Sequence, residues 1–323
     1  MRLLGAAATA AALPWQDLAD AIAQTLHDAA AGRAQAPERW VLPVAPGTSW
    51  FVMPAWTAAD AGDLAAIKLI TYSAGNAARG LPTILGDVLV LRASTGQRLA
   101  LLDGPTVTAR RTAAVSLLAA RHLAPVPGGP LLVVGTGVQA RSHVLALVDG
   151  LGVREVWVRG RSAARATEFA AALQTELDHA MSSGQAPPRA SVRPVADGDA
   201  ALASALARCP LVVTATPAAA PCLDAAVRPD VFIAAVGAFT PSMIELAPPL
   251  TRRLVAQGTV VIDSEAARHE AGDLLGAGVA VQGLPTLGEW LASGRARPCG
   301  PVLFKSCGAA LWDLAAARCA VAG

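Results

Sequence analysis

The stretch Leu131–Ala140, LLVVGTGVQA, constrains the fold of this chain more than any other. An apolar run typical of a buried parallel strand ends at a glycine turn, and a helix-compatible segment, RSHVLALVDG, follows it. Gly135, Gly137 and Ala140 have the spacing of the G-x-G-x-x-A dinucleotide-binding turn. We expect Gly135 to permit the tight turn, Gly137 to admit a pyrophosphate at the helix N-terminus, and Ala140 to let helix and strand pack closely. The candidate cofactor turn consists of Gly135, Thr136, Gly137, Val138, Gln139 and Ala140.

The next segment indicates which dinucleotide is bound. A predicted strand at 153–158 runs directly into Arg159, Arg161 and Ser162. NAD-binding turns place an acidic residue near the end of this strand, whereas Glu155 lies near its start. Guanidinium groups and a hydroxyl suit a ribose 2′-phosphate, although an ordinary exposed basic turn would read the same way. We therefore expect NADPH, with NADH as a second possibility.

The order of predicted elements indicates two domains. Before the linker APVPGGP at 124–130, strands are expected at 38–43, 49–53, 65–72, 87–92 and 99–103, with helices at 15–30 and 105–123. After it, strands at 131–134, 155–158, 192–194, 211–214, 231–236 and 259–263 alternate with helices. A last helix is expected at 302–320. The prediction is an α/β protein: a Rossmann doubly wound parallel sheet domain at 123–301, inserted in a split α+β domain formed by 1–122 and 302–323.

Composition excludes several classes of protein. A net charge of +2 gives no basic surface for nucleic acid, and no apolar run has the ~18 residues of a membrane helix. The N-terminus superficially resembles a signal peptide, but an amphipathic helix follows directly, so we expect it to belong to the fold. The 5 cysteines form no C-x-x-C pair and the 5 histidines no H-E-x-x-H motif. This pattern indicates a reducing, cytoplasmic compartment and no metal site.

Three cationic residues of the first domain are candidates for substrate binding. Lys68 lies inside the apolar run AAIKLI at 65–70, where an ammonium group is expensive to bury. Strand alternation leaves two readings open, with its side chain facing either the core or solvent. Arg39 and Arg111 are further candidates, with solvated surface arginines as the alternative reading.

Several motifs together resemble one known family. They occur in this order: Ile67-Lys68, Gly75-Asn76-x-x-Arg79-Gly80-Leu81-Pro82-Thr83, Leu101-Leu102-Asp103-Gly104, Thr108-x-x-Arg111-Thr112-Ala113-Ala114, Gly135-Thr136-Gly137-Val138-Gln139-Ala140, Val236-Gly237-Ala238 and Phe304-Lys305-Ser306-x-Gly308. The combination resembles the ornithine cyclodeaminase/mu-crystallin family, and the resemblance extends from about residue 39 to residue 317.

The resemblance implies a homodimer whose split first domain builds the dimer interface and the substrate pocket. The residues that it implies for the substrate are Arg39, Met53, Lys68, Arg111, Thr240, Ser306 and Cys307, with Lys68 catalytic and with Ser306 and Cys307 on the last helix. Besides the glycine turn and its basic neighbours, the residues implied near the cofactor are Thr83, Arg111, Thr112, Thr214, Ala215, Thr216, Val236 and Gly237.

One departure from the family pattern bears on the reaction. Cyclodeaminases resemble the pattern Gly-x-Asp-x-Pro, whereas this chain has Phe239 at the Asp position, and phenylalanine exchanges no proton. The branch with Gly-x-Phe-Thr-Pro resembles reductases of cyclic imines. We therefore expect NADPH-dependent reduction of Δ1-pyrroline-2-carboxylate to L-proline or of Δ1-piperideine-2-carboxylate to L-pipecolate, with the ring size open. The alternatives are an open-chain amino-acid dehydrogenase of the alanine type, an ornithine cyclodeaminase and a non-catalytic NADPH-binding protein.

Overall fold

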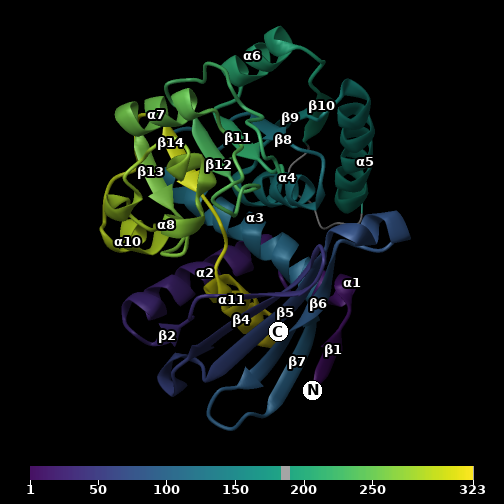
Figure 1. Ribbon diagram of the computed structural model, residues 1–323, viewed down its shortest axis with the longest axis vertical. Helices are drawn as coiled ribbons and strands as arrows, with labels where there is room; N and C mark the ends of the chain where they lie inside the picture. Colours follow the sequence, from purple (N-terminus) through teal and green to yellow (C-terminus); the bar gives the residue numbers. More distant parts are fainter. Residues whose placement is uncertain (183–189, 323) are drawn as a thin grey trace. The chain divides into compact units, whose positions relative to one another are not determined.

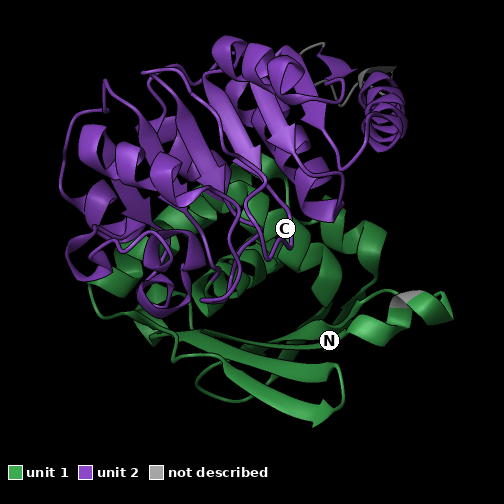
Figure 2. Ribbon diagram, turned by 45° about the horizontal axis from the view of Figure 1, so that its top comes forward, with its two compact units in different colours: residues 1–115, 309–323 green, residues 116–308 purple. Residues whose placement is uncertain are grey.

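The computed structural model describes residues 1–182 and 190–322. The chain divides into two compact units, which Figure 2 colours separately. Unit 1 comprises Met1–Val115 and Ala309–Gly323, and unit 2 comprises Ser116–Gly308. The first boundary falls within helix α3 (Gly104–Leu123).

Unit 1 is an α+β unit built on a seven-stranded sheet with the order β1-β7-β6-β5-β4-β2, in which β3 also pairs with β4 (Figure 1). All of its pairings are antiparallel except that of β1 with β7. Because β1 pairs with β7, the segment Arg2–Leu4 is part of the sheet, as expected for a start that belongs to the fold. The strands are β1 (Arg2–Leu4), β2 (Ala34–Gln35), β3 (Trp40–Ala45), β4 (Thr48–Thr57), β5 (Leu64–Ser73), β6 (Ile84–Arg92) and β7 (Arg98–Asp103). The helices are α1 (Ala6–Ala11), α2 (Trp15–Ala30), the first half of α3, and α11 (Ala310–Ala322).

The two faces of this sheet differ. Helix α11 packs on β4 and β5 and against α2, whose Leu18, Ile22 and Leu26 follow the four-residue spacing of one buried helix face. The opposite face carries large exposed apolar side chains. The β3–β4, β4–β5 and β5–β6 registers place on that face Trp40, Leu42, Trp50, Trp56, Leu69 and Leu85.

Unit 2 confirms the expected doubly wound parallel sheet. Its seven strands are all parallel and have the order β10-β9-β8-β11-β12-β14-β13. The strands are β8 (Leu131–Val134), β9 (Glu155–Arg159), β10 (Ser191–Pro194), β11 (Leu211–Thr214), β12 (Phe232–Ala235), β13 (Thr259–Ile262) and β14 (Val302–Lys305). The helices are α4 (Val138–Leu151), α5 (Ala163–Ser182), α6 (Asp199–Arg208), α7 (Pro248–Gln257), α8 (Ala267–Glu270), α9 (Gly272–Leu275) and α10 (Leu287–Ala292). The strand order reverses between β8 and β11, the place where such sheets bind ligands.

The predicted helix at 302–320 is wrong over its first residues. Val302–Lys305 forms β14, which lies between β12 and β13, and the helix begins only at Ala310. A four-residue apolar run fits a buried strand as well as a buried helix, so its pattern alone did not separate the two. Gly308, at φ +87°, separates the strand from the helix. Ser306 and Cys307 therefore lie in a loop, not on the last helix.

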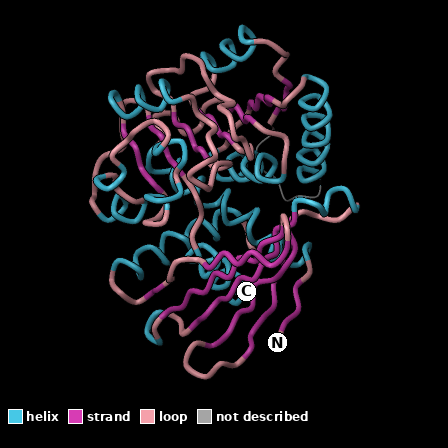
Figure 3. Tube along the Cα trace, in the orientation of Figure 1, coloured by secondary structure: helices cyan, strands magenta, loops and turns pink. Residues whose placement is uncertain are grey.

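The unit boundaries also differ from the expected ones. Residues 302–308 group with unit 2 because β14 is an internal strand of the parallel sheet. Residues 116–122 likewise group with unit 2. Figure 3 shows the strands of both sheets in magenta. Among the described helices, none combines the length and apolar content that crossing a membrane requires.

Candidate active site

The glycine turn between β8 and α4 has the geometry of a phosphate-binding turn. Gly135 has φ +127°, and a Cβ added there would lie 2.6 Å from the carbonyl oxygen of Ala215, so the position needs glycine. Gly137 is the N-cap of α4, and a Cβ added there would meet nothing within 4 Å. Its backbone therefore faces open space beside the first amide groups of a helix, where an anion is favoured. Ala140 is fully buried.

This turn forms one side of a cavity of about 760 Å³, a volume within the range of small-molecule sites. The cavity is lined by residues 134–137, 159–162, 165, 215–218 and 222, all in unit 2. It unites eight of the predicted cofactor residues: Gly135, Thr136, Gly137, Arg159, Arg161, Ser162, Ala215 and Thr216. Predicted residues of unit 2 outside its lining are Val138, Gln139, Ala140, Thr214, Val236 and Gly237. A cavity lined both by a glycine turn and by the arginines Arg159, Arg161 and Arg165 fits a dinucleotide.

The arginines that line the cavity differ from the expected set in one added residue and in the contacts of Arg159. Arg159 lies 3.5 Å from Asp197 and donates a hydrogen bond to a backbone carbonyl, so its guanidinium is partly engaged within the protein. Arg161 lines the cavity and is exposed. Arg165, in the first turn of α5, lines the cavity too. It was not predicted because the sequence does not show which side of this helix faces the cavity. Glu155 is held by Arg208 at 2.7 Å.

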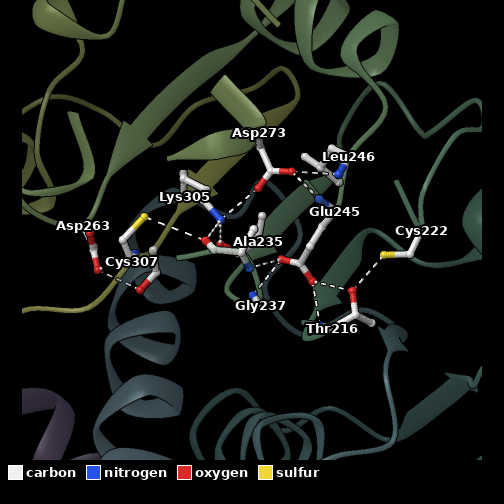
Figure 4. A network of polar contacts seen from close by, with 12 residues as sticks. Thr216, Cys222, Ala235, Gly237, Glu245, Leu246, Asp263, Asp273, Lys305 and Cys307 are labelled. Carbon is white, nitrogen blue, oxygen red and sulfur yellow. Dashed lines mark hydrogen bonds and ion pairs between the residues drawn. The ribbon is translucent and has the colours of Figure 1, made fainter. Parts of the chain in front are cut away.

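A buried polar network lies at the carboxyl ends of β11 and β12 (Figure 4). Glu245 is fully buried, and its Oε1 accepts a 2.8 Å hydrogen bond from the Thr216 amide. Its Oε2 accepts hydrogen bonds from the amides of Gly237 at 2.7 Å and Ala238 at 3.2 Å. One carboxylate therefore joins the ends of two neighbouring strands. Burial raises the pKa of this carboxyl group above its ordinary value.

Lys305 anchors the same turn from β14. Its Nζ lies 2.9 Å from Asp273 and donates hydrogen bonds to the carbonyl oxygens of Ala238 at 2.6 Å and Ala235 at 3.2 Å. Burial opposes its charge, but Asp273, Cys307 and Glu245 together outweigh burial and raise the pKa of the ammonium group. Asp273 also accepts hydrogen bonds from the amides of residues 245 and 246. Glu245, Asp273 and Lys305 were not among the candidate site residues. Lys305 could have been found, because it follows an apolar run just as Lys68 lies within one.

Hydrogen bonds to Asp263 hold the loop before α11 in place. Its Oδ2 accepts hydrogen bonds from the Ser306 hydroxyl at 2.8 Å and from the amides of Cys307 at 3.1 Å and Gly308 at 2.7 Å. The hydroxyl of Ser306 thus makes a structural hydrogen bond, and Cys307 is buried, with 7% of its surface exposed. Thr240 lies 3.3 Å from the Ser242 hydroxyl in the turn after β12.

In unit 1, the structure settles the orientation of Lys68. Its side chain is fully buried, on the side of β5 that packs against α11, and its Nζ lies 3.0 Å from the Asp313 carboxylate. Arg111, which comes from α3, places its Nε 2.9 Å from the same carboxylate. Met53 lies directly opposite Lys68 in the β4–β5 register and is also buried. Two of the three predicted cations, Lys68 and Arg111, therefore converge on Asp313, which was not predicted from the sequence.

The electrostatics of this cluster favour an anionic ligand. Burial, followed by the positive charge of Arg111, lowers the pKa of Lys68 to about 7, and Arg39 contributes in the same direction. Asp313 opposes this shift but is a single carboxylate facing several cations. The Nη1 atom of Arg111 is buried and has no hydrogen-bond partner among the described residues. A buried donor without an acceptor is a ready site for a carboxylate oxygen.

The remaining predicted residues of unit 1 are threonines. Thr83 is exposed, and Thr112 is largely buried with its hydroxyl donating to the Thr108 carbonyl at 2.8 Å. Their roles toward a cofactor stay predictions. Over residues 1–182 and 190–322, no group of His, Cys, Asp and Glu side chains is arranged to hold a metal ion.

Comparison with known proteins assigns the family. The chain is 42% identical over 315 residues to Delta(1)-pyrroline-2-carboxylate reductase 1 of Burkholderia multivorans, covering 98% of this chain and 93% of the relative. It is 34% identical to ketimine reductase mu-crystallin of Mus musculus, covering 89% and 84%. Among solved structures, Thermococcus litoralis Delta(1)-pyrroline-2-carboxylate reductase in complex with NADH and L-proline matches with a TM-score of 0.84, 24% identity and coverage of 100% and 97%. The model of the ornithine cyclodeaminase/mu-crystallin family matches residues 3–321, which confirms the resemblance carried by the motifs. The chain is a member of the ornithine cyclodeaminase/mu-crystallin family.

Proposed function

We propose that this protein is an NADPH-dependent reductase of cyclic imino acids, converting Δ1-pyrroline-2-carboxylate to L-proline and Δ1-piperideine-2-carboxylate to L-pipecolate. Unit 1 would hold the substrate and unit 2 the cofactor. The observation that carries the proposal is the buried cluster of Lys68, Arg111 and Asp313, with its unpartnered guanidinium donor. The Burkholderia and Azospirillum relatives, 42% and 41% identical, bear the names of such reductases.

The residues of unit 1 have distinct proposed roles. Arg111 and Arg39 bind the substrate carboxylate, since guanidinium groups bind carboxylates in a planar fork. Lys68, whose pKa of about 7 lets it exist in both protonation states near neutral pH, holds the proton that belongs on the imine nitrogen. A bound nicotinamide supplies a hydride to the imine carbon. The hydride and the proton together convert C=N to CH–NH, so atoms and charges balance.

The preference for NADPH is the finer part of the proposal. Three solved relatives are complexes with NADH, NAD or NAD+, which supports a nicotinamide cofactor. In this chain, Arg161, Ser162 and Arg165 line the cavity at the end of β9, and an acidic ribose ligand at the strand end is replaced by Arg159. Guanidinium groups at this position support a 2′-phosphate.

We further propose a cytoplasmic homodimer. The outward face of the unit 1 sheet exposes Trp40, Trp50, Trp56 and Leu69, with 38–59% of each side chain accessible. Contiguous exposed apolar side chains of this size are typical of protein interfaces. The 5 cysteines all lie within the described residues and none of them forms a disulfide, as is usual for proteins of a reducing compartment.

The test is a substrate panel followed by the loss of reduced-nicotinamide absorbance, with NADPH and with NADH. The proposal predicts turnover with both cyclic imines and a higher kcat/KM with NADPH. Turnover of pyruvate only when ammonia is present would instead identify an alanine-type dehydrogenase. Release of ammonia from ornithine would identify a cyclodeaminase, which Phe239 argues against because it exchanges no proton. Cofactor binding without any turnover would leave a binding protein.

A further inference from the structure

Asp313 is the acidic residue of helix α11, in a stretch of the helix whose neighbouring side chains are apolar. Its neighbours Trp312, Leu314 and Ala315 are fully buried, and so is Asp313 itself. A buried carboxylate is costly unless cations compensate its charge. The compensating groups come from two distant elements of the same unit, Lys68 on β5 and Arg111 on α3.

Asp313 contacts only some of the hydrogen-bond donors of Lys68 and Arg111. Nε of Arg111 lies 2.9 Å from Asp313 in an ion pair. Within the described part of the chain, neither Nε nor the buried Nη1 of this guanidinium makes a hydrogen bond, so both keep donor capacity for a ligand. Lys68 Nζ lies 3.0 Å from the carboxylate. An ammonium group has three donors, so contact with one carboxylate leaves others for a ligand. The cations Lys68 and Arg111, to which Arg39 adds its positive charge, outnumber the one carboxylate of Asp313, and this balance suits an anionic ligand such as a carboxylate.

We propose that Asp313 is a positioning residue of the reductase: it holds Lys68 and Arg111 at fixed separations, so that one binds the substrate carboxylate while the other presents its proton. This inference rests on the proposed function. Asp313 acts through the two cations and is not itself required to touch substrate.

Among the charged groups that shift the pKa of Lys68, Asp313 is the one that raises it. Arg111 from α3 and Arg39 from the segment before β3 lower the pKa of Lys68, as burial does, while Asp313 from α11 raises it. Met53, opposite on β4, is neutral. Loss of the Asp313 charge therefore lowers the pKa of Lys68 further and leaves less of the ammonium form at neutral pH.

The test compares Asp313→Asn and Asp313→Glu with a matched control, Asp28→Asn. Asp28, on α2, is also buried and lies 2.6 Å from Arg318 of α11. Within the described part of the chain it forms no ion pair with Lys68 or Arg111. We expect Asp313→Asn to lower kcat at pH 8 by about 100-fold, the size of a general-acid contribution, and to raise the KM for the imine. The alkaline fall of its kcat–pH profile should move to lower pH. Asp28→Asn should lower the Tm without moving that profile.

A purely structural role would lower the Tm of Asp313→Asn but leave the KM and the pH profile as in the parent protein, and that result would overturn the inference. If Asp313→Asn does not fold, Asp313→Glu gives the answer. This variant keeps the charge but displaces the carboxylate, so the inference predicts an unchanged pH profile with a raised KM. Parental kcat and KM in Asp313→Glu would contradict positioning.

A binding measurement separates this inference from the proposed function. L-proline is titrated calorimetrically into the parent protein and the variants, with pyrrolidine, which lacks the carboxylate, as the control ligand. We expect Asp313→Asn to weaken L-proline binding at least about 10-fold, a loss of about 1.4 kcal/mol. If the parent binds L-proline but reduces no imine, the proposed reaction fails while the role of Asp313 in carboxylate binding stands. Unchanged L-proline affinity in Asp313→Asn, or no binding of L-proline to the parent, contradicts the inference.

Discussion

The Gly237 amide donates a 2.7 Å hydrogen bond to Oε2 of Glu245, and a Cβ at position 237 would lie 2.5 Å from the other oxygen of that carboxylate. A Cβ at this position would also lie 2.2 Å from the backbone oxygen and 2.3 Å from the backbone nitrogen of Thr216. The close approach of this turn to both Glu245 and the Thr216 backbone therefore requires a residue without a side chain. The same carboxylate holds Thr216, which lines the cofactor cavity.

Glu245→Gln should weaken both the fold and cofactor binding. An amide group in place of either oxygen would face an N–H donor, leaving buried donors unsatisfied at a cost of about 2–4 kcal/mol in the free energy of unfolding. We expect the Kd for NADPH to rise about 10-fold, because the turns after β11 and β12 lose their common anchor. Urea unfolding and cofactor fluorescence titration measure the two effects.

Glu155→Gln is the control for this prediction. Glu155 is paired with Arg208 on the surface and should contribute no more than about 1 kcal/mol. Equal losses of stability in the Glu155 and Glu245 variants would show that the buried anchor has no special importance.

Arg161→Ala and Arg165→Ala test the choice of cofactor. Both side chains line the cavity beyond β9. If they contact a 2′-phosphate, each substitution should raise the Kd for NADPH about 10-fold, which corresponds to a charge-assisted hydrogen bond of about 1.5 kcal/mol. The Kd for NADH, which lacks that phosphate, should stay within twofold and serves as the internal control. Parallel losses for both cofactors would refute a 2′-phosphate site.

The pairing of Lys68 with Asp313 illustrates what the sequence could and could not predict. The glycine turn, the parallel strands and the lysine in an apolar strand were predicted because each is a local pattern. The partner of Lys68 lies 245 residues away, in a helix whose pattern says nothing about which strand it covers. Glu245 and Asp273 were missed for the same reason, since each bonds to backbone groups that only the folded sheet brings near. The β14 strand was misread because its apolar run is too short to reveal a period.

His143 predicts a pH dependence of stability. It is fully buried on α4, with Nδ1 2.7 Å from the Gln139 carbonyl oxygen and Nε2 2.9 Å from the Ser116 hydroxyl. Burial lowers its pKa to about 4 in the folded protein, against 6.5 as its ordinary value. Between these values the unfolded chain binds a proton that the folded chain does not, so stability falls as the pH falls from about 6.5 toward 4.

Between pH 7.5 and pH 5, the titration of His143 alone should lower the free energy of unfolding by about 2 kcal/mol. His143→Gln removes the titration, so its free energy of unfolding should fall less over the same pH range, by about that amount. Urea unfolding of both proteins at the two pH values measures the difference. Identical pH slopes in the two proteins would contradict a buried neutral histidine.

The exposed tryptophans test the proposed homodimer. Trp50 and Leu69 lie on the outward face of the unit 1 sheet, each with 43% of its surface exposed. Trp50→Glu should shift the sedimentation coefficient to that of the monomer, since a charge in an apolar interface loses its hydration. Arg98→Glu, on the exposed start of β7, is the control and should leave the association unchanged. A monomeric parent protein, or a Trp50→Glu variant that still dimerises, would contradict an interface on this face.

The most direct test of the reductase is to follow the hydride itself. The protein is incubated with Δ1-pyrroline-2-carboxylate and with NADPH that carries deuterium at both C4 positions, and the product is examined by NMR. We expect L-proline with deuterium at Cα. In Lys68→Met, its formation should fall by at least about 100-fold while the Kd for NADPH stays unchanged. Absence of deuterated proline from a parent protein that binds NADPH, or full activity in Lys68→Met, would contradict it.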